Sequence, residues 1–270
     1  ERLTAANIIQ QDEALCAVAG QAFCNSSPFT LKDLKSRTNS QQLKLDFIAY
    51  LDGFSANVQD IITKFKFRNE IDTLVEGGVL GLLIEKFVDN RINLSNRPVL
   101  FDDGSVRLPA LDNHSIGTVF EELLRRFNEE NNVTEAGEHF TPRDIVTLMA
   151  EIAFVPIMDK ITDSSYLIYD GACGTGGILS VSEERLQQLA EARGKRINTH
   201  IFGQELQPET YATCKSDLLI KGDGEEANNI SFGSTISEDG KAGMKFDFCI
   251  SNPPFGTPWK RDLENWGLKD

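Results

Sequence analysis

Apolar residues recur at helical spacing along the first half of the chain. Side chains three and four positions apart lie on one face of an α-helix, so such runs predict amphipathic helices that bury one stripe. The runs begin at Val58, Ile71, Leu80 and Ile116, and they end at Phe65, Val75, Val88 and Phe127. We therefore predict an all-helical domain over residues 1–134, interrupted at residues 95–111 by a loop or a small irregular insertion that contains an Asp-Asp-Gly sequence.

From residue 135 onward, short apolar runs alternate with helical stretches. The strand candidates are residues 167–169, 200–203, 229–232 and 246–250, and the helix candidates between them are residues 178–192 and the stretch from Pro208 to Leu219. This alternation predicts a parallel sheet with helices on both faces, because parallel neighbours need a crossover connection. We expect an α/β domain over residues 135–270, preceded by the helical domain.

Several chemically interesting groups directly follow strand candidates. They are the glycine-rich run from Asp170 to Gly177, the acid Glu205, and Asn252 with the residues after it. Ligands of open α/β sheets bind at the carboxyl ends of the strands, so we expect these groups at one edge of one sheet. Their convergence is stronger evidence for a binding site than any of the motifs alone.

The residues from Asp170 to Gly177, Asp-Gly-Ala-Cys-Gly-Thr-Gly-Gly, predict a tight turn that opens a helix. Glycines let the backbone turn sharply and let a ligand approach it, and the amides at a helix start are free donors. No Gly-Lys-Ser/Thr follows, which excludes a Walker-type loop, and the glycine order differs from the usual dinucleotide fingerprint. A nucleoside with a zwitterionic amino-acid tail, such as S-adenosylmethionine, is compatible. A plain turn of an α/β protein is the alternative.

Two further segments carry candidate cofactor contacts. Glu205 follows the second strand candidate, where an acid accepts hydrogen bonds from ribose hydroxyls in nucleotide-binding sheets; a solvated acid at a strand end is the alternative. Residues 138–143, Glu-His-Phe-Thr-Pro-Arg, lie just upstream of the sheet. There Thr141 is predicted to cap a helix whose first residue is Pro142, with Asp144 completing the capping pattern.

The decisive motif is Asn252-Pro253-Pro254-Phe255, at the end of the last strand candidate. Prolines restrict the residues before them, so Asn252 is expected in a rigid extended segment. The side-chain carbonyl of Asn252 and the main-chain carbonyl of Pro253 can accept the hydrogens of an amino group and leave its nitrogen free to attack a sulfonium methyl. Phe255 offers a flat surface for a base taken out of the stack. A proline-rich turn after an edge strand is the alternative.

Composition changes this picture in two respects. The net charge of −14 is too acidic for a chain that grips a DNA duplex alone, because Lys and Arg supply most non-specific affinity. Five scattered cysteines and three histidines without a metal-ligand spacing indicate a reducing compartment and no structural metal. Cys173 and Cys249, which lie near the motifs, are expected to be small buried hydrophobes. No run approaches the ~18 apolar residues of a membrane span.

Together the motifs resemble those of a known family. The order His-Phe-Thr-Pro-Arg (139–143), Asp-Gly-Ala-Cys-Gly-Thr-Gly-Gly (170–177), Gly-Gln-Glu-Leu (203–206) and Ser-Asn-Pro-Pro-Phe-Gly (251–256) is similar to that of adenine-specific DNA amino-methyltransferases. More narrowly, it resembles the modification (methyltransferase) subunit of type I restriction–modification systems. The resemblance covers roughly residues 57–260 and implies a Rossmann-like S-adenosylmethionine-dependent methyltransferase domain.

The resemblance also implies a role for each motif. It places the target adenine against the catalytic residues Asn252, Pro253, Pro254 and Phe255. It places the cofactor S-adenosyl-L-methionine against Glu138, His139, Phe140, Thr141, Pro142, Arg143, Asp170, Thr175, Gly176, Gly177 and Glu205. One residue departs from the family pattern: Gly171 replaces the usual proline, for which we expect a looser loop and an intact site.

The same resemblance accounts for the acidic charge. It implies a cytoplasmic complex with DNA, a specificity subunit that reads the DNA sequence, a restriction subunit and a second modification subunit. The chain starts at Glu1 without a methionine and ends at Asp270, soon after the catalytic motif, whereas the family fold continues. We therefore expect a piece of a longer gene product, with a methyltransferase domain that is incomplete at its C-terminus.

Two alternatives stay open at this point. Asn-Pro-Pro followed by an aromatic residue also serves the methylation of RNA bases and of protein glutamine, although Phe255 in place of tyrosine and the helical first half favour DNA adenine. A non-catalytic cofactor-binding or scaffolding module belongs to a different class and is favoured by the early end of the chain and its weak basic character. Transfer of a labelled methyl group to DNA distinguishes these readings.

Overall fold

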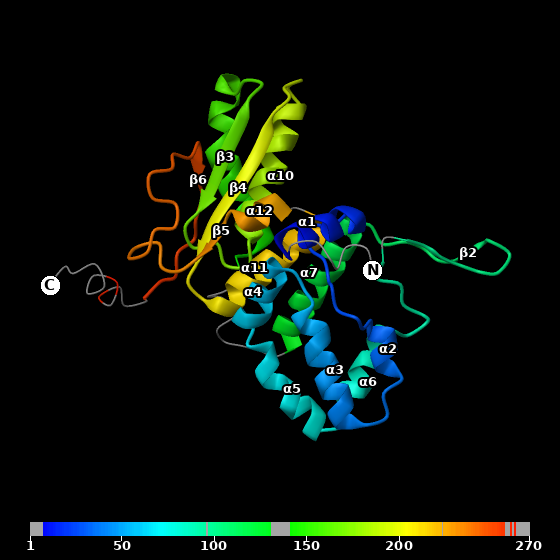
Figure 1. The fold of residues 1–270 in the computed structure, drawn as a ribbon. Coiled ribbons are helices and arrows are strands. Elements are labelled where there is room, and N and C mark those ends of the chain that lie inside the picture. Colours follow the sequence, from blue (N-terminus) through cyan, green and yellow to red (C-terminus); the bar gives the residue numbers. More distant parts are fainter. Residues whose placement is uncertain are drawn as a thin grey trace. The chain divides into compact units, whose positions relative to one another are not determined.

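The computed structural model describes residues 8–95, 97–130, 141–222, 224–256, 260 and 262 of the chain (Figure 1). The chain divides into two compact units, one made of Glu1–Arg125 with Ser216–Gly224 and the other of Arg126–Lys215 with Glu225–Asp270. The predicted boundary between residues 134 and 135 lies outside the described residues and stays a prediction. Among the helices that are described, none is long and apolar enough to cross a membrane.

The first unit is built from helices, as the apolar spacing predicts. In chain order they are α1 (Ile8–Ala19), α2 (Leu31–Lys35), α3 (Ser40–Asp52), α4 (Ala56–Lys64), α5 (Phe67–Glu76), α6 (Leu80–Phe87) and α7 (Asn113–Glu130), whose last residues belong to the second unit. From α2 to α6 the apolar stripes meet in one core, because each helix buries a single face. The buried members of this core are Leu34, Leu43, Phe47, Leu51, Ile62, Ile71, Leu80 and Ile84.

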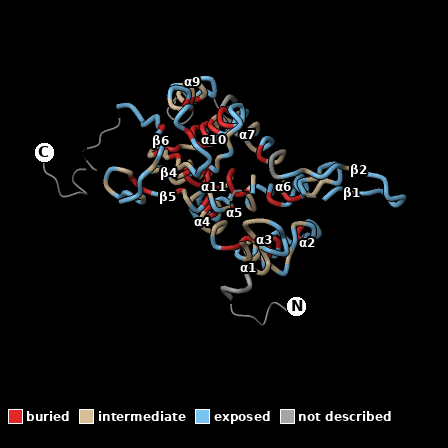
Figure 2. The backbone as a smooth tube through the Cα atoms, turned by 90° about the horizontal axis from the view of Figure 1, so that it is seen from above, coloured by how far each residue is buried: buried red, intermediate tan, exposed pale blue. Residues whose placement is uncertain are grey.

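Residues 95–111 contain a β-hairpin. β1 (Val99–Leu100) and β2 (Val106–Leu108) pair antiparallel, and Gly104 in the connecting turn adopts a left-handed conformation with φ of 83°. The prediction of a loop or an irregular insertion is therefore wrong for these short strands, because two or three residues do not establish an alternating pattern. Figure 2 shows the hairpin as largely exposed, in contrast to the buried stretches of the helices.

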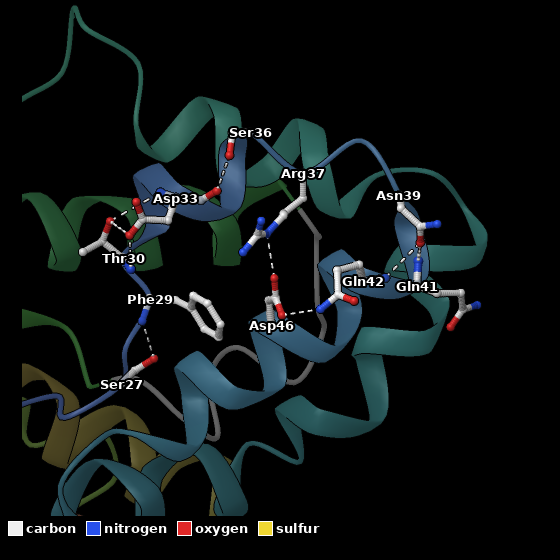
Figure 3. A network of polar contacts seen from close by, with 10 residues as sticks. All are labelled: Ser27, Phe29, Thr30, Asp33, Ser36, Arg37, Asn39, Gln41, Gln42 and Asp46. Atoms are coloured by element: carbon white, nitrogen blue, oxygen red, sulfur yellow. Dashed lines mark hydrogen bonds and ion pairs between the residues drawn. The ribbon is translucent and has the colours of Figure 1, made fainter.

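An ion pair between the exposed Arg37 and the buried Asp46 joins the segment after α2 to α3 in the first unit (Figure 3). Arg37 Nε donates to Asp46 Oδ2 at 2.7 Å, and Gln42 Nε2 donates to Asp46 Oδ1 at 2.7 Å. Asp46 is only 5% exposed, so its charge is stable there only while both oxygens have partners. The guanidinium of Arg37 also lies 5.7 Å from the centre of the Phe29 ring, and Asn39 caps the start of α3.

The second unit alternates strands with helices. Its elements are α9 (Arg143–Phe154), the 3₁₀ helix η1 (Val155–Lys160), β3 (Ser165–Asp170), α10 (Gly177–Glu191), β4 (Asn198–Glu205), α11 (Pro208–Lys221), α12 (Gly224–Asn228), β5 (Ile230–Phe232) and β6 (Phe248–Cys249). The C-terminal end of α11 and the first residue of α12 fall in the first unit. Each strand candidate corresponds to one of β3 to β6, so the predicted α/β architecture is confirmed.

Within the described residues, β3 to β6 form a four-stranded parallel sheet in the order β5-β4-β3-β6 (Figure 1). Pairing with β4 extends along the whole of β3, from Ser165 to Asp170. Ile168 and its register partner Ile201 are almost fully buried, and α10 packs against β3, β4 and α9. Because the strands are parallel, their carboxyl ends lie at the same edge of the sheet.

The opposite face of the sheet carries an aromatic cluster. Tyr169 and Phe202 are register partners, and the Phe246 ring stacks on Tyr169 with 4.5 Å between ring centres. Alternate residues of a strand share a face, so the fully buried Gln204 lies on the same side as Phe202. Gln204 Nε2 donates to Glu238 O at 2.8 Å, which fixes the segment between β5 and β6 over this face.

Candidate functional site

Asp170 is the last residue of β3 and is completely buried. Its Oδ1 accepts hydrogen bonds from Ala172 N at 3.0 Å and from Ser251 Oγ at 2.6 Å, whereas Oδ2 has no partner among the described residues. Burial raises the pKa of Asp170 to about 6; the two hydrogen bonds oppose this rise, and the charge of Glu205 adds to it. A buried acid with a free oxygen and a shifted pKa marks this edge of the sheet as a candidate ligand site.

The glycine-rich loop after Asp170 contains two residues in the left-handed region, Gly174 with φ of 56° and Gly176 with φ of 87°. A Cβ on Gly176 would lie 2.8 Å from Cys214 Sγ, so packing also requires glycine there. Gly177, the first residue of α10, has neither constraint, because a Cβ there would meet no atom of the described residues within 4 Å. The helix start at Gly177 is therefore open to a ligand.

The carboxylate of Glu205, at the end of β4, holds the glycine-rich loop in place. Its Oε2 accepts a hydrogen bond from Gly174 N at 2.9 Å, and its Oε1 accepts one from Gln207 N at 2.7 Å. The main chain adds a bond from Cys173 N to Gln204 O at 3.0 Å. Each carboxylate oxygen can accept two hydrogen bonds, so the half-buried Glu205 retains capacity for a further donor.

The Asn-Pro-Pro-Phe motif leaves the sheet directly from β6. The main-chain pairing of β6 with β3 reaches Ile250, whose N donates to Tyr169 O at 3.0 Å. One residue further on, the hydroxyl of Ser251 continues this pairing through a side-chain bond to Asp170 Oδ1. Asn252 therefore starts at the strand end that also carries Asp170 and the glycine-rich loop.

The motif itself lies at the surface. Asn252, Pro253, Pro254 and Phe255 are all exposed, and Phe255 is 83% exposed. A ring this open does not pack against the described part of the chain and is available to a ligand. Asn252 Nδ2 donates to Thr141 Oγ1 at 3.1 Å, so the amide nitrogen faces Thr141 and the amide oxygen Oδ1 is directed elsewhere as an acceptor.

The start of α9 differs from the prediction. The helix begins at Arg143, Pro142 is its N-cap with an extended ψ of 137°, and no side chain caps it. The prediction that Thr141 caps a helix beginning at Pro142 is therefore wrong, because the Thr141 hydroxyl accepts from Asn252 instead. Arg143 Nη2 is paired with Glu184 Oε2 of α10 at 3.1 Å on the surface.

The structure brings most of the predicted site residues to the carboxyl edge of the sheet. Hydrogen bonds join Asp170 to the residue before Asn252, Asn252 to Thr141, and Glu205 to the glycine-rich loop. Thr175, Gly176 and Gly177 lie in that loop and at the start of α10. Glu138, His139 and Phe140 lie outside the described residues, so their predicted cofactor contacts stay predictions.

Some residues that shape the site have no role predicted from the sequence, although two of them lie within the motifs. Ser251 and Gln204 each stand next to a predicted site residue, and the polarity of both at the end of a strand is the signal that marks them. Thr235 had no such signal; its Oγ1 donates to Gly171 O. This bond anchors Gly171, where glycine replaces the usual proline and a looser loop is expected.

The two cysteines near the site lie in different environments. Cys173 is buried as expected, and a hydrogen bond with Cys214, together with burial, raises its pKa well above the ordinary value. Cys249 is exposed, so the prediction that it is buried is wrong: it lies on β6, which is the edge strand of the described sheet. Within the described ranges, no group of three or more His, Cys, Asp or Glu side chains is placed to hold a metal ion.

Comparison with known proteins assigns the family of the chain. The family model described as N-6 DNA Methylase matches residues 111–267, which is more than half of the chain. The matched region includes the glycine-rich loop, Glu205 and the Asn-Pro-Pro-Phe motif. The chain therefore belongs to the N-6 DNA methylase family.

Similar curated proteins are methylase subunits of type I restriction enzymes. The MpnII methylase subunit of Mycoplasma pneumoniae is 27% identical, over 96% of this chain and 49% of its own length. The HindI methylase subunit of Haemophilus influenzae is 28% identical, over 68% of this chain and 39% of its own length. The MjaIX methylase subunit of Methanocaldococcus jannaschii is 31% identical, over 52% of this chain and 22% of its own length.

A solved structure shares the fold. It is the crystal structure of the methyltransferase subunit of a type I restriction–modification system from Streptococcus thermophilus, with a TM-score of 0.60 and 17% identity. The match covers 96% of this chain and 51% of that chain. The predicted Rossmann-like methyltransferase fold is thus confirmed, and the chain spans about half the length, or less, of the relatives it matches.

Proposed function

We propose that this chain transfers a methyl group from S-adenosylmethionine to the exocyclic amino group of adenine in DNA, as part of the modification subunit of a type I restriction–modification complex. The observation that carries the proposal is the convergence of Asp170, Glu205 and Asn252 at the ends of neighbouring parallel strands. Ser251 joins the first of these residues to the last through one hydrogen bond. In this proposal the cofactor binds beside Asp170 and Glu205, and the adenine amino group binds at the adjacent Asn252.

The residues present fit S-adenosylmethionine. Gly177 leaves room for a ligand at the start of α10, where the free amides and the helix dipole favour a carboxylate. Oδ2 of Asp170 has no partner among the described residues and is an acceptor for an ammonium group, and Glu205 has remaining acceptor capacity for ribose hydroxyls. Thr141, Pro142, Arg143 and Thr175 stay predicted contacts. When bound, the cofactor supplies an electrophilic methyl group.

The chain's own part in the reaction is to hold and orient the adenine amino group. Asn252 Oδ1 and Pro253 O accept its two hydrogens, which directs the nitrogen lone pair away from the motif. Both carbonyl dipoles also stabilise the positive charge that develops on the nitrogen as it is alkylated. The exposed ring of Phe255 stacks against the flipped base, and Pro254 keeps the segment rigid.

The acidic charge of the chain supports a division of labour within a complex. The chain has 27 basic and 41 acidic side chains, and its net charge of −14 opposes binding to the phosphates of DNA. We infer that a specificity subunit supplies the grip on DNA and the sequence reading, with a second modification subunit and a restriction subunit completing the cytoplasmic complex. The relatives, described as type I methylase subunits, support this assignment.

The proposal is tested by following tritium from labelled S-adenosylmethionine into DNA. The complete gene product is assayed alone and together with the specificity subunit of the same system. We expect label in N6-methyladenine only when the two are combined. Label in RNA or in protein glutamine instead of DNA would move the substrate assignment to another amino-methyltransferase, and cofactor binding without any transfer would favour a non-catalytic module.

A further inference from the structure

We propose that Ser251 is a positioning residue for methyl transfer, because its hydroxyl fixes the acceptor motif to the same carboxylate oxygen that holds the cofactor loop. The inference rests on the proposed function and adds a residue to which neither the motifs nor the comparisons give a role. Ser251 need not touch substrate or cofactor. It acts through Asp170 on one side and through Asn252 on the other.

One oxygen of Asp170 holds both the acceptor motif and the glycine-rich loop. Asp170 Oδ1 accepts from Ser251 Oγ at 2.6 Å and from Ala172 N at 3.0 Å. The first bond fixes the residue before Asn252, and the second fixes the turn of the glycine-rich loop. Asp170 has no exposed surface and is the last residue of β3, so the anchor sits on a rigid element.

A side-chain bond is needed at this point because the main-chain pairing of β6 gives way to the motif. Ile250 N still donates to Tyr169 O, and the prolines at positions 253 and 254 have no amide to donate. The side-chain bond of Ser251 therefore fixes the chain to β3 one residue beyond the last main-chain hydrogen bond, next to Asn252. The bond joins residues 81 positions apart and has a buried, charge-bearing acceptor, which makes it stronger than a neutral surface bond.

The functional consequence concerns the distance between two bound reactants. Methyl transfer requires the amino nitrogen and the methyl carbon within about 3–3.5 Å and in line, and a displacement of about 1 Å can lower the rate about a hundredfold. The glycine-rich loop belongs to the cofactor side, and Asn252 belongs to the acceptor side. Anchoring both on Asp170 Oδ1 keeps their separation constant.

The test compares Ser251→Ala and Ser251→Thr in the complete gene product assembled with its specificity subunit. Ser251 is exposed, so the methyl group of threonine has room while its hydroxyl can still donate to Asp170. Ser182→Ala is the matched control: it removes a fully buried hydroxyl that has no hydrogen-bond partner among the described residues and that lies in α10 outside the site. Folding of each variant is checked by thermal unfolding.

Single-turnover transfer of labelled methyl groups and calorimetric binding of S-adenosylmethionine are then measured. For Ser251→Ala we expect the transfer rate to fall about 10- to 100-fold with cofactor affinity within about twofold of the wild type. Ser251→Thr should recover most of the rate, and Ser182→Ala should transfer at the wild-type rate.

The measurements distinguish a failure of the positioning role of Ser251 from a failure of the proposed function. If the wild-type complex transfers methyl groups and Ser251→Ala does so equally fast, the positioning role is overturned and the proposed function stands. A loss of cofactor affinity as large as the loss of rate would also overturn the positioning role, because the hydroxyl would then support only the cofactor loop. A threonine variant as slow as the alanine variant would overturn it too, because the hydroxyl would then have no specific effect on the rate. If the wild-type complex transfers nothing, the proposed function and the role of Ser251 both fall.

Discussion

The side chain of Asn252 donates a hydrogen bond from Nδ2 to Thr141 Oγ1 at 3.1 Å, across 111 positions of the chain. This contact sets which end of the amide is presented to a substrate. With the nitrogen held by Thr141, the oxygen is the end left to accept an amino hydrogen. The segment expected to bind cofactor thus also orients the residue expected to bind adenine.

Replacing Thr141 by valine tests this orientation, because valine keeps the shape and lacks the hydroxyl. We expect Thr141→Val to lower the methyl-transfer rate about tenfold, the effect of roughly one lost hydrogen bond, while Thr141→Ser stays close to the wild type. The rates come from single-turnover assays and the cofactor affinity from calorimetry. A weakened cofactor affinity with an unchanged rate would show that Thr141 serves the cofactor alone.

Replacing Gly177 by alanine tests whether a ligand approaches the start of α10. No atom of the described residues lies within 4 Å of the added Cβ, so we expect the variant to fold normally and to gain up to about 1 kcal/mol in free energy of unfolding. We expect S-adenosylmethionine to bind about tenfold more weakly, equivalent to ~1.4 kcal/mol.

The matched control is Gly81→Ala in α6, where the added Cβ meets only Leu43 Cδ2, at an ordinary distance of 3.6 Å. It should change stability similarly and leave cofactor binding unchanged. Unaltered binding in Gly177→Ala, measured by calorimetry, would mean that the cofactor does not contact this helix start.

The buried Asp170 predicts a specific pH dependence of stability. Burial raises its pKa to about 6, above the value near 4 expected in the unfolded chain. Between these values the folded state holds the proton more tightly, so the free energy of unfolding falls as the pH rises through about 6. Asp170→Asn cannot titrate, and its stability relative to the wild type should increase by up to about 3 kcal/mol between about pH 4 and pH 7.5.

Chemical unfolding of both proteins over this pH range measures the difference, in which titrating groups that do not interact with Asp170 cancel. The sign is diagnostic: the wild type loses stability relative to Asp170→Asn as the pH rises. Parallel stability curves would show that the Asp170 carboxyl has an ordinary pKa and is more hydrated than its burial indicates.

In the first unit, the ion pair between Arg37 and Asp46 should contribute measurably to stability. Asp46→Ala removes a buried carboxylate that accepts from Arg37 and Gln42, and we expect a loss of about 1–3 kcal/mol in the free energy of unfolding. The control is Asp52→Ala, which removes an exposed partner of Arg68 and should cost about 0–1 kcal/mol. Equal losses in denaturant unfolding would show that burial of Asp46 does not matter.

The regular elements could be predicted from the sequence because their signals are local. Helical spacing in α4, α5 and α6 and the apolar runs of β3 and β4 arise from residues close together in the chain, and each periodicity fits one geometry. The placement of Asp170, Glu205 and Asn252 at one edge also follows, since parallel strands present their carboxyl ends together.

The contacts within the site could not be predicted in this way. The bonds from Ser251 to Asp170 and from Asn252 to Thr141 depend on strand order and on the path of the chain between distant segments. The sequence pattern around Thr141 predicts a helix N-cap. In the structure the Thr141 hydroxyl accepts from the distant Asn252 instead of from an amide at the helix start. Cys249 looked like a core residue, and its exposure follows from the edge position of β6, which no local pattern reports.

In the proposed function, Asn252 holds the amino group of adenine for methyl transfer. Single-turnover transfer of labelled methyl groups to DNA is measured for the wild type and for Asn252→Ala, each assembled with the specificity subunit, and cofactor affinity is measured in parallel. We predict label in N6-methyladenine with the wild type, and a loss of at least about a hundredfold in Asn252→Ala with cofactor affinity within about twofold of the wild type. Transfer by Asn252→Ala at the wild-type rate would show that Asn252 does not hold the amino group.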